Sequence, residues 1–317
     1  LVPRSALLFG ALLLPPALTQ AQRTQLQGLD AYVNKAIKDW EVPGLGLAIV
    51  KNDSIVHAAG YGVKELGKPT AVTPQTIFAI GSASKAFTAA LIGLAVDEGK
   101  VKWDDQAEKY LTGFHIADPY ASRELTIRDL LSHRSGLARG DLLWYGSELT
   151  REEILHRVRY LQPTWSFRSN FGYQNIMYLA AGQVSARVFG KSWDDLVHER
   201  IFAPLGMNHS NTTVTKLKAL TDVSTPHTRL DNKITPIGWR NIDNVAPAGS
   251  INSNVVDMAQ WVRMHLGKGT YAGKQVLKPA TVREMHSSMT IIRNDPRTDS
   301  LLPETHFRSY GLGWFLE

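Results

Sequence analysis

The sequence predicts an α+β fold, in which an antiparallel sheet is flanked by helices and joined to an all-helical subdomain. Three observations lead to this prediction. A helix and a β-hairpin open the chain, helical patterns fill its middle from about residue 103 to 206, and strand-like residues return at 310–316. An order of helix, strands, helical block and strands is typical of one sheet with packed helices.

The first elements after residue 21 are a helix and two strands. Apolar residues recur at helical spacing within residues 24–40, which predicts an amphipathic helix that ends at Pro43-Gly44. The apolar run 45–50, the Asn52-Asp53 turn and the segment 54–60 predict a hairpin. Further short extended segments are expected at 62–68 and 76–80.

The remaining elements are mostly helical. Patterns of apolar residues predict helices at 86–96, 126–132, 149–161, 176–187, 192–201, 255–266 and 279–286. Ser192 is a candidate cap with Asp194 and Asp195 in the first turn, and Pro279 suits a first helical position. Residues 207–250 are polar and predict loops.

The composition of the chain argues against several classes of function. The 317 residues are 44% hydrophobic and 20% charged, as in ordinary globular proteins. There is no cysteine, which excludes disulfides, thiolate chemistry and cysteine-based zinc sites. The net charge is +6, but acidic pairs such as Asp104-Asp105 interrupt the basic residues, so nucleic-acid binding is not expected. A mildly basic protein favours anionic surfaces, which suggests peripheral association with a cell envelope.

Residues 1–21 are expected to lie outside the fold. Leu1–Ser5 is similar to a thrombin-site remnant of an expression tag. Residues 6–14 are an apolar run, Pro15-Pro16 ends it, and Thr19-Gln20-Ala21 offers small residues to a signal peptidase. The run is too short for a transmembrane span. We therefore expect a signal peptide, a secreted or periplasmic location, and a single folded domain over residues 22–317.

The segment Gly81-Ser82-Ala83-Ser84-Lys85 is the first candidate for chemistry. It follows the apolar run 76–80 and begins a helical pattern, so Ser82 and Lys85 lie on one helical face. A lysine whose pKa is lowered by burial can take the proton of a serine, which makes the serine a nucleophile. The alternative is that Ser82 caps the helix and Lys85 is a solvated side chain.

Tyr173 and Asn175 form a second candidate pair, at a predicted loop-to-helix junction. A tyrosinate beside a lysine can pass a proton from a serine to a leaving group. An asparagine amide can hold a lysine or a substrate carbonyl. The alternative is a buried aromatic residue next to a capping asparagine. Tyr32-Val33-Asn34 has the same spacing but lies in the middle of the first helix, so we do not assign it.

Together these motifs resemble the penicillin-recognising serine hydrolases, which comprise class C β-lactamases, D,D-peptidases and related family VIII esterases. The resemblance covers about residues 25–317 in the family's order. It rests on these segments: Phe78–Thr88 around Ser-x-x-Lys, Leu130–Leu137, Tyr173-Gln174-Asn175 with Tyr178 and Gly182, Ile201–Met207, Pro247–Ser250 and Tyr310–Trp314.

The resemblance implies a β-lactamase/transpeptidase-like fold and assigns roles. It implies that Ser82 is the nucleophile, Lys85 its base and Tyr173 the proton shuttle, while the Ser82 backbone N–H forms half of an oxyanion hole. Asn175 is expected to hold the substrate or Lys85, and Gly249 and Ser250 are expected to line the substrate cleft. His133 is expected to be a structural strut. No metal and no organic cofactor are expected, because acyl transfer to serine and then to water needs neither.

The family's third motif, Lys-Thr-Gly or His-x-Gly on a strand after Tyr310–Trp314, has no counterpart that we assign. His265-Leu266-Gly267 and Lys268-Gly269-Thr270 lie before that segment. We therefore expect that the sequence in hand is truncated at its C-terminal end.

These observations predict an exported serine hydrolase that acts through an acyl-enzyme on β-lactams, D-amino-acid peptides or small esters. One alternative is a non-catalytic peptidoglycan or β-lactam sensor on the same fold. Another is a metal-dependent hydrolase, which the ten histidines do not favour because none lie in a His-Glu-x-x-His or His-x-x-x-His pattern. The oligomeric state is left open.

Overall fold

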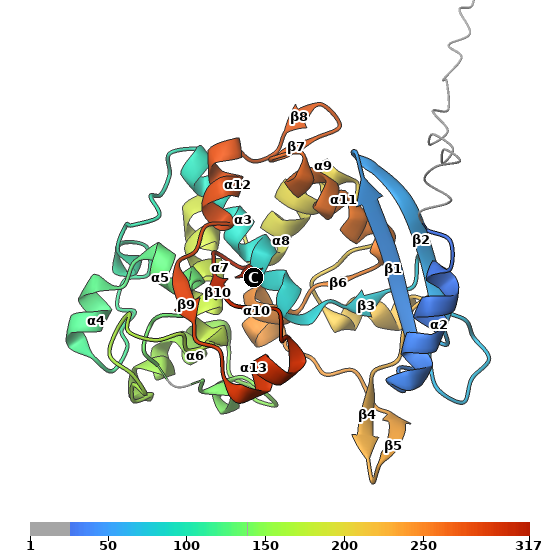
Figure 1. Ribbon diagram of the computed structural model, residues 1–317. Coiled ribbons are helices and arrows are strands. Elements are labelled where there is room, and N and C mark those ends of the chain that lie inside the picture. Colours follow the sequence, from blue (N-terminus) through green and yellow to red (C-terminus); the bar gives the residue numbers. More distant parts are fainter. Residues whose placement is uncertain (1–25, 138) are drawn as a thin grey trace, which may run out of the picture.

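A computed structural model describes residues 26–137 and 139–317 (Figure 1). The predicted signal peptide lies outside the described residues, and the single-domain boundary at residue 22 stays a prediction. The α-helices are α2 (Leu29–Asp39), α3 (Ser84–Asp97), α4 (Pro119–Glu124), α5 (Ile127–Leu131), α6 (Arg151–Arg157), α7 (Asn175–Phe189), α8 (Trp193–Val197), α9 (Ala203–Leu205), α10 (Ala246–Gly249), α11 (Val255–Leu266), α12 (Pro279–Met285) and α13 (Pro296–Leu301). The strands are β1 (Gly44–Lys51), β2 (Ser54–Gly62), β3 (Phe78–Ala79), β4 (His227–Leu230), β5 (Lys233–Pro236), β6 (Asn252–Ser253), β7 (Thr270–Tyr271), β8 (Lys274–Gln275), β9 (Thr290–Ile292), β10 (Arg308–Tyr310) and β11 (Phe315–Leu316).

The α+β prediction is confirmed. Figure 1 shows the long β1–β2 hairpin beside α2 and α11, with the helical block on the other side of α3. Within the described residues, the named strands form small antiparallel sheets: β1–β2, β9–β10–β11, β3–β6, β4–β5 and β7–β8. Asn52 and Asp53 both adopt positive φ, 49° and 58°, as the predicted two-residue turn between β1 and β2 requires.

Helix α3 is the centre of the molecule. Its sequence is apolar on almost every side, and all but its last two residues are buried. A helix with no polar face is stable only when other elements surround it. Helices α7, α8, α10 and α12 pack against α3, which therefore has a fixed position relative to every other part of the site.

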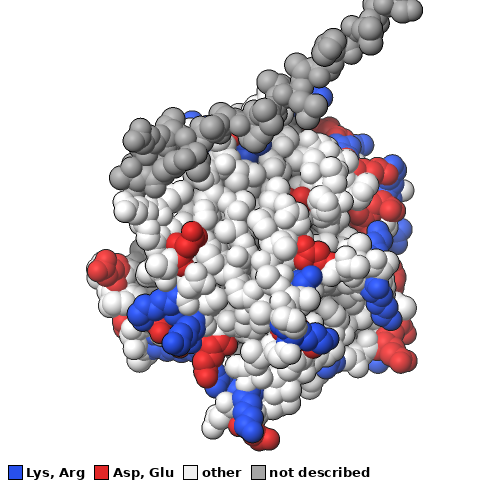
Figure 2. All heavy atoms as spheres, turned by 90° about the vertical axis from the view of Figure 1, so that its right-hand side faces the viewer, with Lys and Arg blue, Asp and Glu red and all other residues white. Residues whose placement is uncertain are grey.

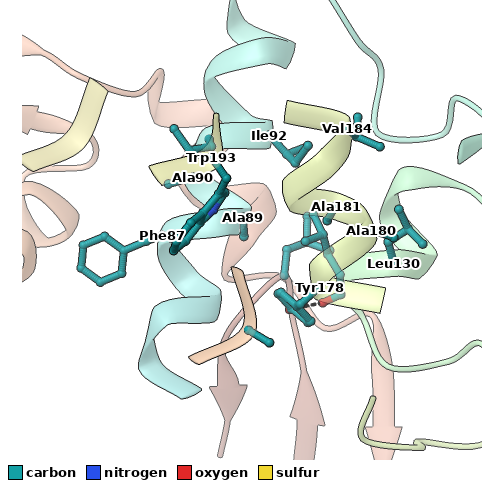
Figure 3. Packing of buried hydrophobic residues seen from close by; sticks show 14 of the residues in the cluster. Phe87, Ala89, Ala90, Ile92, Leu130, Tyr178, Ala180, Ala181, Val184 and Trp193 are labelled. Carbon is teal, nitrogen blue, oxygen red and sulfur yellow. Dashed lines mark hydrogen bonds between the residues drawn. The ribbon is translucent and has the colours of Figure 1, made fainter. Parts of the chain in front are cut away.

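The packing of α3 against α7 forms the main core (Figure 3). The two helices contribute Phe87, Ala89, Ala90 and Ile92 from α3 and Tyr178, Ala180, Ala181 and Val184 from α7, with Trp193 of α8 and Leu130 of α5 beside them. Trp193 Nε1 donates to Thr88 Oγ1 at 3.0 Å, and the Thr88 hydroxyl donates to the Pro247 carbonyl at 2.7 Å. These bonds join α3, α8 and α10 through buried polar groups that all have partners.

Gly182 allows α10 to approach α7. A Cβ at this position would lie 2.3 Å from Pro247 Cγ, closer than any real contact. The close approach matters because α10 carries the Ala248 carbonyl that faces the site.

Several expected elements differ from the structure. The expected strand at 62–68 is mostly turn, with one bridge between Val63 and Ala71. The strand expected at 76–80 is reduced to β3, which one parallel bridge between Ile77 and Val223 precedes. The 207–250 stretch, predicted as loops, contains the β4–β5 hairpin and α10. By contrast, α11 has the bounds that its apolar pattern predicts.

Charges of both signs are mixed over the surface. On the face shown in Figure 2, basic and acidic side chains lie mainly along the right-hand side and the lower part, beside a broad and mostly uncharged area in the middle. None of the helices in the described ranges has the length and apolar content that would let it cross a bilayer.

Candidate active site

Ser82 is held at the entrance to α3 by a well-defined backbone path. β3 pairs with β6, and the Ile80 N–H then donates to the Ile251 carbonyl at 3.0 Å. Residues Gly81–Ala83 form a short 3₁₀ turn, η1, that continues into α3. Ser82 is exposed, and neither η1 nor α3 has a side-chain cap. The alternative reading of Ser82 as a helix cap is therefore wrong.

Lys85 lies under Ser82 and is fully buried, so it is not the solvated side chain of the alternative reading. Its Nζ is hydrogen-bonded to Ser82 Oγ at 3.1 Å, to Asn175 Oδ1 at 2.8 Å and to the Ala248 carbonyl at 2.8 Å. The amine is thus fixed on three sides and directed at the serine oxygen.

Burial lowers the pKa of Lys85 from 10.5 to about 7. The main cause is loss of hydration, which disfavours the charged form. The positive charge of Arg139 lowers this pKa further, whereas the carboxylate of Asp141 raises it. A substantial fraction of the amine is therefore neutral near pH 7 and can accept a proton.

Tyr173 and Asn175 meet Lys85 where α7 begins. Gln174 is the N-cap of α7, and its side chain accepts from the Ile176 N–H, so Asn175 is not the capping residue. Lys85 Nζ lies 4.7 Å from the centroid of the Tyr173 ring. Burial raises the pKa of Tyr173, and its hydrogen bond with Ser82 offsets part of that rise. The free protein therefore holds a neutral phenol beside the serine at neutral pH, and the tyrosinate expected from the sequence is not its resting form.

Asp141 and Arg139 complete the network, and no sequence motif singled them out. Asn175 Nδ2 donates to Asp141 Oδ1 at 3.0 Å, and Arg139 Nε donates to the other oxygen of Asp141. The Arg139 guanidinium lies 5.1 Å from the Tyr173 ring centroid. The only feature of the sequence that could have indicated them is that Arg139 and Asp141 carry opposite charges, two residues apart, just after the Leu130–Leu137 segment.

His133 supports the loop that carries Tyr173, as predicted. It is buried, its Nδ1 accepts from the Gln174 N–H at 3.1 Å, and its ring lies 4.3 Å from the Tyr173 ring. Its carbonyl accepts from the Gly172 N–H at 2.8 Å. Burial holds the pKa of His133 well below its usual value, so it stays neutral.

Gly249 and Ser250 lie beside the entrance to α3. A Cβ at Gly249 would lie 3.8 Å from the Gly81 carbonyl carbon, and Ser250 is 3% exposed. Their predicted contact with substrate stays a prediction. The residue from this segment that does reach the site is Ala248, through a backbone carbonyl that no side-chain motif could have revealed.

Within the described ranges, no three or more histidine, cysteine, aspartate or glutamate side chains are grouped so that they could hold a metal ion. His265, which we did not assign as a third motif, packs at the end of α11 against Trp261, His286 and Trp314.

Comparisons with known proteins agree with the resemblance seen in the sequence. A family model described as Beta-lactamase matches residues 29–317. The chain is 29% identical, over 89% of its length, to a protein named Unguisins hydrolase ungD' from Aspergillus campestris, and this match covers 53% of that protein. It is 30% identical, over 78% of its length, to Penicillin-binding protein 4 of Amycolatopsis lactamdurans, covering 66% of that protein.

Solved structures show the same fold. An octameric penicillin-binding protein homologue from Pyrococcus abyssi matches with a TM-score of 0.77 and 22% identity, over 92% of this chain and 65% of that one. A putative beta-lactamase from Bacteroides dorei matches with a TM-score of 0.67 and 24% identity, over 91% of this chain and 78% of that one. The chain spans between about half and two thirds of the two curated relatives described above.

Proposed function

Because the chain belongs to the beta-lactamase family, we propose that it is an exported serine hydrolase and that Ser82 forms the acyl-enzyme. We propose β-lactams, D-amino-acid peptides and small esters as its substrates. The observation that carries this proposal is the hydrogen bond between the exposed Ser82 hydroxyl and the buried Lys85 amine.

The proposed acylation step follows from that geometry. The neutral Lys85 amine takes the hydroxyl proton as Ser82 Oγ attacks the substrate carbonyl carbon, which gives a tetrahedral oxyanion and an ammonium. The carbonyl reforms when the leaving group departs with a proton, leaving the acyl group on Ser82. In deacylation a water molecule gives a proton to the same amine as its oxygen attacks the acyl carbon. The bond between the acyl carbon and Ser82 Oγ then breaks, the ammonium returns the proton to Ser82 Oγ, and the acid is released.

Tyr173 is the proposed carrier of the proton to the leaving group. Its raised pKa keeps it a neutral phenol, so it acts by accepting one proton while it donates another rather than as a standing tyrosinate. Asn175 holds the Lys85 amine in place through its side-chain oxygen. Gly249 and Ser250 are proposed to line the substrate cleft, which their position beside Gly81 supports.

The names of two relatives support one of these substrate classes and the hydrolytic step. One is named as a penicillin-binding protein, which supports reactivity with β-lactams, and another as a hydrolase, which supports turnover rather than stable binding. Export rests on the apolar run and the small residues within 6–21. Fusion of residues 1–21 to a reporter that is active only outside the cytoplasm tests export.

Intact-mass measurement after incubation with a fluorescent penicillin or a fluorophosphonate tests the nucleophile. The expected result is one adduct on the wild type and none on Ser82→Ala. Ser169→Ala, which removes an exposed loop hydroxyl, is the matched control and should label normally. Turnover of nitrocefin and of p-nitrophenyl esters is followed in parallel. An adduct that forms on Ser82 and persists, with no turnover of any substrate class, would identify a sensor instead.

A further inference from the structure

We infer that Asp141 is a positioning residue of the acylation reaction, which orients the Asn175 amide so that its oxygen faces Lys85, and that Arg139 holds Asp141 in that position. This inference rests on the proposed function, because it takes Lys85 as the base for Ser82.

Asp141 lies at the start of a short 3₁₀ turn, η3 (Asp141–Leu143), next to the site. Its carboxylate accepts three hydrogen bonds. Asn175 Nδ2 and Trp144 Nε1 donate to Oδ1 at 3.0 and 3.1 Å, and Arg139 Nε donates to Oδ2. Donors from three directions leave the carboxylate one orientation, in which Oδ1 faces Asn175.

The consequence for Lys85 comes from the two different ends of an amide. Asn175 could turn either its oxygen or its NH₂ group toward the lysine. A carboxylate can only accept hydrogen bonds, so Asp141 fixes the NH₂ end on its own side. The oxygen must then face Lys85 Nζ, where it lies at 2.8 Å. A flipped amide would direct two donors at the amine, and the neutral amine's lone pair would turn toward Asn175 instead of toward Ser82.

Arg139 and Asp141 also act on Lys85 with opposite charges. The groups that face Lys85 and carry charge or titrate are Tyr173, Tyr178, His133, Arg139 and Asp141. The arginine lowers the pKa of Lys85 and the aspartate raises it, so the pair together shifts that pKa less than the arginine alone would. Loss of the Asp141 charge should therefore lower the pKa of Lys85, and loss of the Arg139 charge should raise it.

The test compares acylation rates and their pH profiles for Asp141→Leu, Asp141→Asn and Arg139→Gln, in the full chain with Ser82 intact. Asp141→Leu removes the acceptor, and we expect acylation to slow roughly 10- to 100-fold. Asp141→Asn keeps an oxygen for the Asn175 amide but removes the charge. It should retain most of the rate and move the midpoint of the pH profile down. Arg139→Gln should move that midpoint up.

A second comparison separates positioning from a general structural effect. In an Asn175→Ala background there is no amide to orient, so Asp141→Leu should cause little further loss. Equal losses with and without the Asn175 amide would overturn the inference, as would wild-type rates and pH midpoints in both Asp141 variants. If Asp141→Leu does not fold, the smaller change Asp141→Ala, which also removes the acceptor, takes its place in both backgrounds.

If the proposed function itself is wrong, the experiments give a different result. In that case Ser82→Ala still labels, or Lys85→Ala acylates at the wild-type rate, whatever the Asp141 variants do. With Ser82 and Lys85 both required, the Asp141 and Arg139 results report on the positioning role alone.

Discussion

Ser82 and Lys85 are hydrogen-bonded at 3.1 Å, yet Ser82 is exposed and Lys85 is fully buried. Ser82 lies in the 3₁₀ turn η1, none of whose residues is buried, whereas Lys85 is the second residue of α3, which is buried from Ser84 to Ala95. The proposed nucleophile is thus exposed to solvent, while burial keeps water away from the proposed base and lowers the pKa of Lys85.

Replacement of Ser82 by alanine should abolish covalent labelling and leave the melting temperature nearly unchanged. The side chain is exposed and caps no helix, so the change in the free energy of unfolding should stay within about 1 kcal/mol. Mass spectrometry and thermal unfolding check both parts. Labelling that survives in the alanine variant would remove Ser82 from the mechanism.

Lys85→Ala and Tyr173→Phe should each slow acylation by orders of magnitude, and the double variant should be hardly slower than either one. Residues that share one proton-transfer step are strongly non-additive. Stopped-flow acylation rates of the three variants form the test. Losses that multiply in the double variant would mean that the two side chains act in separate steps.

The acylation rate should rise with pH, with a midpoint near the Lys85 pKa of about 7. Lys85 must be neutral to accept the Ser82 proton, so protonation below that pH removes the base. Tyr173 has a pKa above its usual value of 10 and should add no second step below about pH 9. A profile of kcat/KM from about pH 5 to 9 measures this, and a rate that stays flat down to the acid end of that range contradicts Lys85 as the base.

Lys85 should also make stability depend on pH. Its folded-state pKa of about 7 is below the unfolded value of 10.5, so between these values the unfolded state binds more protons. Unfolding free energy should therefore rise with pH from about 7 to 10.5, by at most ~5 kcal/mol relative to Lys85→Met. Urea denaturation of both proteins at about pH 7 and about pH 9.5 tests the sign. The prediction is refuted if the unfolding free energy of the wild type minus that of Lys85→Met stays constant or falls between these two pH values.

Gly313→Ala should destabilise the fold by more than about 2 kcal/mol. Gly313 has a φ of 88°, and a Cβ there would lie 2.9 Å from Ala86 Cα, the residue after Lys85. Gly113→Ala is the matched control, since Gly113 has a φ of 79° but a Cβ added there would meet nothing within 4 Å. The control should show only the backbone strain, about 1 kcal/mol. Equal losses in the two variants would mean that the contact with α3 is unimportant.

Local patterns predicted much of the fold. The bounds of α11, the Asn52-Asp53 turn and the start of α7 next to Tyr173 follow from periodicity and turn chemistry within a few residues. The β4–β5 hairpin was missed because its strands are four residues each and mostly polar. Four mostly polar residues are too few to show the alternation that predicts a strand.

The sequence by itself determined that Ser82 and Lys85 share one helical face, since that relation depends only on three residues of spacing, and it marked Tyr173 and Asn175 as their partners. Only the tertiary structure decided that Lys85 is buried, that the Ala248 carbonyl holds it, and that Asp141 and Arg139 complete the network. These contacts join residues far apart in the chain, such as Lys85 and Ala248, separated by 163 positions. No periodicity records such pairs, because the packing of α3, α7 and α10 creates them only when the chain folds.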